Sequence, residues 1–399
     1  MNANLLTTLK AAMKKTGVGA IFVSNPKNVK FLTGFKTTMP GEVQSFGDPE
    51  GFVLVHAARM DFLCDGRYIN AARQMSGVTA QLLESPVNPA RIAGKIKELL
   101  PGNVRTLGVE QDAMVYSDGL ALAENLKGLT LKAAEGVLAG LRLCKSPEEI
   151  ALLRKAEAIT GDCFNHVIKV IRPGMTEREV GLEVDNYLRA HSEGCSFETI
   201  VAFGETSCNP HYVPDAKRKL KKGQLVLLDL GSIHQGYCGD MTRVVCMGQA
   251  DDRQREVYSI VLEAQLAGLA AVRPGVKAHD IDQAVRQVFE KYNCVDQFLH
   301  GTGHGIGLAI HEGPRIKSGF DTMIEAGMVF SIEPGLYYPG WGGVRIEDVV
   351  AVTKDGYENL TRTPKKQLIE LGAAGGVSRQ TVKKKTPAKR QAAKRKPHR

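Results

Sequence analysis

The chain has 399 residues, and its hydrophobic fraction of 43% and charged fraction of 24% are those of an ordinary soluble globular protein with room for two domains. No apolar stretch approaches the roughly 20 residues of a membrane span, and the N-terminus lacks a signal-peptide pattern, so we expect a cytoplasmic protein without a membrane segment. Of the 52 basic residues, ten lie in residues 377–399 with no acid, which leaves 42 against 43 acids and gives the body no basic signal for nucleic acid.

Residues 1–140 alternate helix and strand patterns, which predicts an α/β domain with a central sheet. Leu5, Leu9 and Met13 have the spacing of an amphipathic helix, and residues 24–26, Ser-Asn-Pro, predict a turn. Strands are expected at 19–23, 52–55 and 60–63, and further helices at about 67–74, 90–99 and 117–126. No catalytic constellation appears in this part of the sequence.

A second domain, residues 146–371, is expected after a boundary near residues 130–146. It begins with a strong helix start, because Ser146 is a good N-cap, Pro147 suits the first turn and Glu149 stands three residues after the cap.

This second domain contains an internal sequence repeat. The sequence V-I-R-P-G-M at 170–175 is matched by A-V-R-P-G-V at 271–276, and each copy ends one helix pattern and precedes another, at about 176–191 and 280–292. Each second helix leads into β-type segments. The matching order predicts two related halves of one domain.

Residues 225–245, L-V-L-L-D-L-G-S-I-H-Q-G-Y-C-G-D-M-T-R-V-V, predict a β-hairpin that carries two acids. If the turn is centred between His234 and Gln235, Asp229 lies opposite Asp240 and the two side chains share a face, with Cβ atoms roughly 5 Å apart. Two carboxylates side by side on apolar strands repel each other and are poorly solvated. We therefore expect a cation between them, most simply a metal ion.

A second hairpin with paired acids is expected in the second half of the domain. Its strand, turn and returning strand are predicted at 328–333, 334–343 and 344–350. Glu333 and Glu347 are symmetric about Gly340, so they also share a face in this register.

Three histidines, His300, His304 and His311, lie between the two hairpins in a glycine-rich sequence that lets backbone pack closely and frees imidazoles to point into a cavity. Four carboxylates and an imidazole form a hard, anionic set, and none of the eight scattered cysteines belongs to a metal-type cluster. Such a set suits Mn²⁺ or another borderline divalent ion, and four acids suffice to hold two ions by bridging. Two ions activate water and polarise a carbonyl, so the residues predict hydrolysis of an amide or related bond, with other histidines as proton donors or oxyanion stabilisers.

Five motifs in this order carry a resemblance to a known family. They are D-L-G at 229–231, D-M-T-R at 240–243, H-G-T-G-H-G-I-G at 300–307, S-I-E-P-G at 331–335 and V-R-I-E-D at 344–348. Together they resemble the pita-bread metallopeptidases, and among these Xaa-Pro dipeptidase (prolidase) and Xaa-Pro aminopeptidase (aminopeptidase P). The resemblance covers nearly all of residues 1–371. It implies an α+β protein, with a creatinase-like α/β N-terminal domain at 1–140 followed by a pita-bread catalytic domain with a pseudo-twofold, curved antiparallel sheet at 146–371.

The resemblance also implies roles for ten residues. The metal ligands would be Asp229, Asp240, His304, Glu333 and Glu347. Asp240 and Glu347 would bridge both ions, and Glu333 would also act as general base. The implied substrate contacts are His211 near the scissile bond, His311 at the carbonyl oxygen or leaving nitrogen, His300 in the pocket wall, Arg315 at the C-terminal carboxylate and Arg345 as an orienting arginine. From the sequence alone, Arg315 fits a structural ion pair equally well.

The function that follows is a dinuclear exopeptidase that hydrolyses the Xaa-Pro bond, foremost in dipeptides, through a metal-bridging hydroxide. We expect two divalent ions, with Mn²⁺ ahead of Co²⁺, Zn²⁺ or Fe²⁺, and a homodimer. The nearest alternative is aminopeptidase P, which acts on longer peptides; creatinase-type hydrolases dispense with metals, and the presence of all five ligands argues against them. An alternative of another class is a nucleic-acid or ribosome-associated protein that acts through the basic tail, residues 375–399, which we expect to be disordered.

Overall fold

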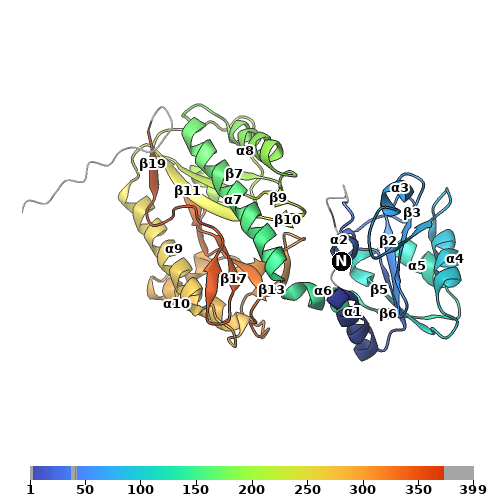
Figure 1. Cartoon of the computed structure of the whole chain (residues 1–399). Coiled ribbons are helices and arrows are strands. Elements are labelled where there is room, and N and C mark those ends of the chain that lie inside the picture. The colour runs from blue at the N-terminus through green and yellow to red at the C-terminus, as the bar shows by residue number, and fades with distance from the viewer. Residues whose placement is uncertain (1–2, 37–40, 42, 373–399) are drawn as a thin grey trace, which may run out of the picture.

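The structure, a computed structural model, describes residues 3–36, 41 and 43–372. Figure 1 shows an N-terminal domain, blue to cyan, beside a larger catalytic domain that runs from green to red, and the short helix α6 (Glu135–Leu143) lies where the two meet. The basic tail predicted at 375–399 lies outside the described residues, so its disorder and its nucleic-acid binding stay predictions. Among the described residues, no helix is long and apolar enough to cross a membrane.

The N-terminal domain is built on a six-stranded sheet of order β4-β3-β2-β1-β5-β6. Its strands are β1 (Ala20–Val23), β2 (Phe52–His56), β3 (Met60–Cys64), β4 (Thr79–Leu82), β5 (Thr106–Val109) and β6 (Thr130–Ala133). Its other helices are α1 (Ala3–Thr16), α2 (Pro26–Thr33), α3 (Ile69–Ala72), α4 (Pro89–Leu99) and α5 (Tyr116–Asn125). Alternate residues of β1 face two cores, because Ile21 packs with α1, α2 and α6 while Phe22 packs with α4 and α5.

The α/β prediction for this domain is confirmed, with one local correction. The turn predicted at 24–26 is the start of α2, where the Asn25 side chain accepts hydrogen bonds from the amides of Lys27 and Asn28, and Pro26 takes the first helical position. Strands β4, β5 and β6 were not predicted. Each has only four residues, and the residues of β4 and β6 do not alternate between buried and exposed positions.

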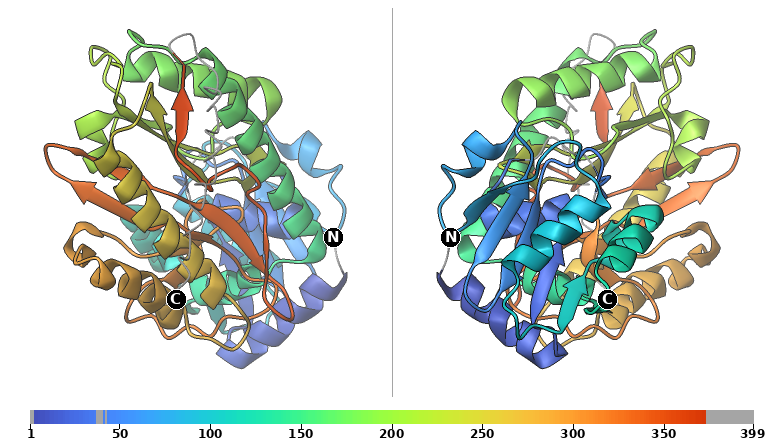
Figure 2. Two further views of the ribbon diagram at one scale, coloured as in Figure 1. Left: turned by 90° about the vertical axis from the view of Figure 1, so that its left-hand side faces the viewer. Right: turned by 90° about the vertical axis from the view of Figure 1, so that its right-hand side faces the viewer.

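The catalytic domain has two halves, each a helix pair followed by a sheet whose strands are antiparallel, except that β19, from the end of the domain, adds to the first sheet parallel to β11. In the first half, α7 (Pro147–Val170) and α8 (Glu177–His191) precede the sheet β19-β11-β8-β7, whose strands are Ile369–Leu371, Met241–Met247, Leu225–Leu230 and Ile200–Phe203. In the second half, α9 (Asp252–Ala271) and α10 (Ala278–Lys291) precede the sheet β13-β12-β14-β17-β18, whose strands are Glu312–Ile316, Gly303–Gly305, Val329–Ile332, Asp348–Val352 and Tyr357–Asn359. Seen from the side of this domain, these helices and strands lie in front of the N-terminal domain (Figure 2).

The internal sequence repeat lies at equivalent points of the two halves. Gly174 and Gly275 both have positive φ, 93° and 85°, and their amides donate to the carbonyls of Leu220 and Ile324 over 2.9 Å in each case. The predicted repeat is thus seen in the backbone as well as in the sequence.

The first hairpin forms with a register that differs from the predicted one. β9 (Ile233–His234) and β10 (Tyr237–Cys238) enclose a turn whose central residues, Gln235 and Gly236, have positive φ of 50° and 84°, as a type I′ turn requires. The turn centre lies one residue later than predicted, so Asp229 pairs with Thr242 and not with Asp240. A shift of two positions keeps the face of each side chain, and Asp240 still lies on the side of Asp229.

The second hairpin has the predicted register. Ile332 pairs with Asp348 and Gly335 pairs with Arg345, which sets Glu333 opposite Glu347. The predicted long turn is wrong in part, because β15 (Gly335–Tyr338) and β16 (Gly342–Arg345) continue the ladder within it.

Candidate active site

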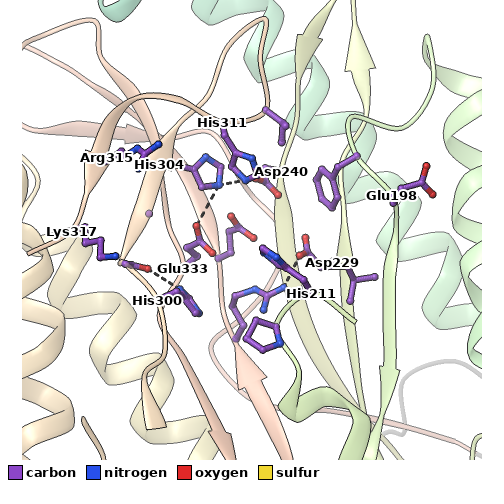
Figure 3. Close-up of a pocket in the computed structure, with 18 of the residues that line it drawn as sticks. Glu198, His211, Asp229, Asp240, His300, His304, His311, Arg315, Lys317 and Glu333 are labelled. Carbon is purple, nitrogen blue, oxygen red and sulfur yellow. Dashed lines mark hydrogen bonds and ion pairs between the residues drawn. The ribbon is translucent and has the colours of Figure 1, made fainter. Parts of the chain in front are cut away.

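A pocket of about 1100 Å³ lies in the catalytic domain, and all ten predicted site residues line it (Figure 3). Its position follows from the alternation of β8, where Val226 and Leu228 pack with α7 and α8 while Leu225 and Leu227 pack with the second half. Asp229 continues the second set, so it points toward the other half of the domain.

Asp240, His304 and Glu347 form the centre of the pocket, with one ligand atom of each within 4.8 Å of the others. His304 Nε2 lies 3.5 Å from Asp240 Oδ2 and 3.4 Å from Glu333 Oε1 (Figure 3). The His304 ring donates its Nδ1–H to the Gly305 carbonyl over 3.1 Å. Its burial lowers the pKa, so the ring is neutral and Nε2 presents a lone pair to the two carboxylates, which is the form that binds a metal ion.

The carboxylates of this centre repel one another. Burial, and then the neighbouring Glu347 and Asp229, raise the pKa of Asp240 well above its ordinary value. Burial, and then Glu333 and Asp229, do the same to Glu347. Burial also raises the pKa of Glu333. A divalent cation would remove this repulsion.

The two carboxylate oxygens of Asp229 differ in their partners. Arg345 donates Nη2–H to Oδ2 over 2.6 Å, whereas Oδ1 is buried and has no hydrogen-bond partner among the described residues. A buried carboxylate oxygen aimed at the pocket without a partner fits a metal ligand. The five predicted ligands therefore fit divalent ions by their donor atoms, their charge and this orphaned oxygen.

Hydrogen bonds to three protein groups hold the Arg345 guanidinium in place. Besides Asp229, it donates to the Tyr337 hydroxyl and to Thr242 Oγ1, each over 2.8 Å, and Thr242 in turn donates to Glu347 Oε2 over 2.7 Å. This geometry makes Arg345 a residue that positions two carboxylates. Nothing in the sequence pattern assigned a site role to Tyr337 or Thr242, although Thr242 stands within the D-M-T-R motif.

The other histidines surround the centre at different depths. His300 donates Nδ1–H to the Gly301 carbonyl and accepts from the Tyr337 hydroxyl at Nε2, both over 2.8 Å. The His311 ring lies 4.3 Å from the His304 ring, and burial, followed by the nearby His304, lowers its pKa to about 4. His211 is exposed at the pocket wall.

The pocket has charged side chains of opposite sign at two places. Arg315 lies on β13 and Lys317 directly follows this strand, and both are exposed. Figure 3 shows both on one side of the carboxylates, with Glu198 on the other side. In the part of the chain that the structure describes, neither cation has a carboxylate partner within ion-pair distance, so the structural ion pair considered for Arg315 is absent there. Lys317 and Glu198 carry no recognisable motif and were not predicted.

The fold and this donor set define a pita-bread metallopeptidase. Residues 151–354 match metallopeptidase family M24, and residues 6–144 match the creatinase/prolidase N-terminal domain. The chain belongs to metallopeptidase family M24. It is accordingly a metal-dependent exopeptidase, and its family implies divalent metal ions.

Similar proteins cover nearly the whole chain. A Xaa-Pro dipeptidase of Pyrococcus furiosus is 34% identical over 368 residues, which are 91% of this chain and 99% of that protein. Among solved structures, a Xaa-Pro dipeptidase from Bacillus anthracis has a TM-score of 0.84 and 35% identity, and covers 92% of this chain and 99% of its own. An X-Pro aminopeptidase from Thermotoga maritima has a TM-score of 0.79 and 27% identity, with coverages of 90% and 99%.

Proposed function

We propose that this enzyme hydrolyses the Xaa-Pro bond of dipeptides with two divalent ions, Mn²⁺ foremost. The proposed ligands are Asp229, Asp240, His304, Glu333 and Glu347. The observation that carries the proposal is that these five donors converge in one pocket, which is also lined by two cations, Arg315 and Lys317, that have no carboxylate partner among the described residues. The names of the P. furiosus and B. anthracis relatives support the substrate class.

The described residues suggest how the ions would be shared. Asp240 and Glu347 lie in the group of closest donors and are proposed to bridge, while Asp229 would serve one ion and His304 with Glu333 the other. When bound, divalent ions supply Lewis acidity, which polarises a carbonyl and makes water acidic near neutral pH.

The chain's own residues would move the protons. Glu333 lines the pocket beside His304 and Asp240, and it is proposed to accept a proton from the attacking water. The nitrogen of an Xaa-Pro bond carries no hydrogen and must be protonated as it leaves. His311 and His211 line the pocket and are proposed as donors to this nitrogen or to the developing oxyanion.

A dipeptide offers a free carboxylate one residue after the scissile bond. Arg315 and Lys317 are proposed to bind it, since they lie on the same side of the carboxylate cluster and have no carboxylate partner among the described residues. The opposite side, with Glu198, would face the substrate's α-amino group. Arg345 donates to protein groups from each of its three nitrogens, and it is proposed to position Asp229 and not to bind substrate.

The test compares two substrates with the chelator-stripped protein after Mn²⁺ is restored. We expect hydrolysis of Ala-Pro and little hydrolysis of Ala-Pro-Ala. A preference for the tripeptide would instead identify an aminopeptidase P, in keeping with the T. maritima neighbour. If the protein binds no divalent ion and cleaves neither peptide, the proposal is wrong. The homodimer and the cytoplasmic location stay predictions, which light scattering and cell fractionation would test.

A further inference from the structure

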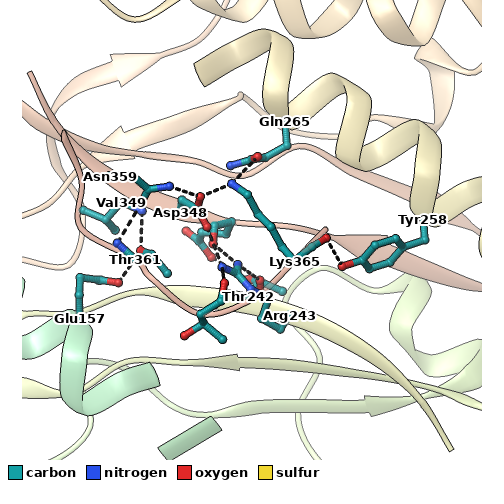
Figure 4. Close-up of polar contacts among 12 residues, drawn as sticks. Glu157, Thr242, Arg243, Tyr258, Gln265, Asp348, Val349, Asn359, Thr361 and Lys365 are labelled. Atoms are coloured by element: carbon teal, nitrogen blue, oxygen red, sulfur yellow. Dashed lines mark hydrogen bonds and ion pairs between the residues drawn. The ribbon is translucent and has the colours of Figure 1, made fainter. Parts of the chain in front are cut away.

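A C-terminal segment of the catalytic domain, residues 359–365, makes buried polar contacts with Glu157, Arg243 and Asp348 (Figure 4). Four alternate residues of this segment make polar contacts with these buried side chains. They are Asn359, Thr361, Thr363 and Lys365. We call residues 359–365 the strap. The strap lies beyond residues 151–354, which match the metallopeptidase family.

The strap reaches the backbone of Asp240 through one buried carboxylate. Thr361 Oγ1 donates to Glu157 Oε2 over 2.6 Å and accepts from the amide of Val349 over 2.9 Å. Glu157 Oε1 in turn accepts from the Asp240 amide over 2.7 Å. The Thr361 hydroxyl thus uses both its donor and an acceptor site to tie Asp240 and the strand after Glu347 to the strap.

The strap reaches the backbone of Glu347 through a buried ion cluster. Arg243, on β11, donates to the Glu347 carbonyl from Nη1, and from Nη2 to Asp348 Oδ1 over 2.7 Å and to the Thr363 carbonyl over 2.9 Å. Lys365 Nζ donates to Asp348 Oδ2, and to Gln265 on α9 over 2.7 Å. Arg243 and Asp348 are fully buried, so these contacts are not shared with water.

We propose that the strap fixes the backbones of Asp240 and Glu347, and that Thr361 and Lys365 are positioning residues which set metal affinity. The inference rests on the proposed function, in which these two carboxylates bridge the ions. A bridging ligand must suit two ions at once, so a small displacement of its backbone weakens both sites. Groups that orient metal ligands typically contribute about 10- to 100-fold to metal affinity.

Thr361→Val is the first variant, because valine keeps the shape of threonine and removes both hydrogen bonds. Calorimetric titration of the full-length, chelator-stripped protein with Mn²⁺ should show binding about 10- to 100-fold weaker than in the parent. Thr361→Ser restores the hydroxyl and should bring the affinity back to within about threefold. Thr353→Val, the same change at an exposed position, should leave the affinity unchanged.

Lys365→Met is the second variant, and it leaves Asp348 with Arg243 and Asn359. It should weaken Mn²⁺ binding in the same direction, whereas Lys366→Met at the exposed neighbouring position should not. Urea unfolding of each metal-free variant establishes the conditions under which it is folded, and affinity is compared there. If both folded variants bind both ions as tightly as the parent, the proposed role of the strap is wrong, while the proposed function stays intact. A parent that binds no Mn²⁺ would overturn the proposed function and the strap with it.

Discussion

At the scale of the residue, the candidate metal site is a concentration of negative charge that the protein alone does not neutralise. Among the described residues, only Arg345 donates from a guanidinium or ammonium group to one of the four carboxylates. The pKa values of Asp240, Glu333 and Glu347 are therefore raised above the ordinary 3.8 of aspartate and 4.5 of glutamate. His304, with its lowered pKa, stays neutral and ready to bind.

These shifts predict a pH-dependent metal affinity. A carboxyl with a raised pKa keeps its proton in the metal-free protein to higher pH, and that proton must leave when an ion binds. Mn²⁺ binding should release protons, and affinity should rise with pH through the range above the ordinary carboxyl pKa and level off once these carboxyls are ionised. Titration calorimetry in two buffers of different ionisation enthalpy measures the released protons. Binding without proton release at the acid end of this range would contradict the raised pKa values.

The sequence singled out the candidate ligands because acids on apolar strands are conspicuous, and because Asp229 with Asp240 and Glu333 with Glu347 form symmetric pairs in the predicted registers. It could not identify Thr242 and Tyr337, whose importance comes from the side chain of Arg345 lying between them. The roles of His211 and Arg315 came from the family resemblance alone.

At the scale of the element, strand β12 is placed by glycines that leave no room for a side chain. A Cβ on Gly303 would lie 1.9 Å from the Ser331 carbonyl oxygen, and one on Gly305 would lie 1.9 Å from the Gly313 carbonyl oxygen. His304 stands between these two glycines. The close packing expected from the glycine-rich sequence is therefore confirmed, and it fixes His304, a candidate ligand, against the neighbouring strands β14 and β13.

Gly303→Ala should force β12 away from β14. Overpacking of this kind costs about 1–3 kcal/mol in the free energy of unfolding, and the displacement should also weaken Mn²⁺ binding through His304. Gly356→Ala is the matched control, because nothing lies within 4 Å of its Cβ position. Urea unfolding and metal titration of both variants measure the two effects. Equal stability of the two variants would show that the contact at Gly303 relaxes without cost.

The first hairpin shows how far sequence reasoning extends at this scale. Its strands and its two acids were predicted, but the turn centre was placed one residue too early, because the preference of Gln235-Gly236 for positive φ was not weighed. Moving the turn centre by one residue moves the strand pairing by two positions. Because side chains along a strand alternate with a period of two, Asp240 still shares a face with Asp229, and the error did not change the predicted site.

At the scale of the whole molecule, the N-terminal domain is tied to the strand beside His311. Arg142, on α6, donates to Asn28 on α2 over 2.8 Å and pairs with Glu312 on β13. Lys145 Nζ lies 2.9 Å from Glu312 Oε1, and its side chain is 1% exposed. Glu110 accepts from Asn28 within the N-terminal domain. These buried hydrogen bonds and ion pairs thus connect the two domains next to the pocket.

Glu312→Gln should leave Arg142 and Lys145 without their buried counter-charge. Breaking a buried ion pair on one side costs about 3–5 kcal/mol in the free energy of unfolding, and kcat should fall because β13 also carries Arg315 and follows His311. Glu358→Gln breaks a half-exposed pair with Arg154 and should cost about 0–1 kcal/mol. Denaturant unfolding and kinetics with Ala-Pro compare the two. A Glu312→Gln protein as stable and active as Glu358→Gln would show that the interdomain contact is dispensable.

The sequence predicted the class of both domains and the repeat within the second, because those depend on local patterns. It did not predict the interdomain pair, whose members stand 170 residues apart, nor the contacts of the strap, where Thr361 meets Glu157 across 204 residues. Such contacts join residues with no local pattern in common. They are visible only once the two halves of the catalytic domain and the N-terminal domain are packed together.

The central claim is that Asp240 belongs to a centre of two metal ions. The most direct measurement is the metal content of the parent and of Asp240→Ala after equilibration with Mn²⁺, with the exposed Asp355→Ala as control. The account predicts two ions per chain in the parent and in the control, and none in Asp240→Ala. An Asp240→Ala protein that keeps an ion and full activity, or a parent that holds fewer than two, would contradict it.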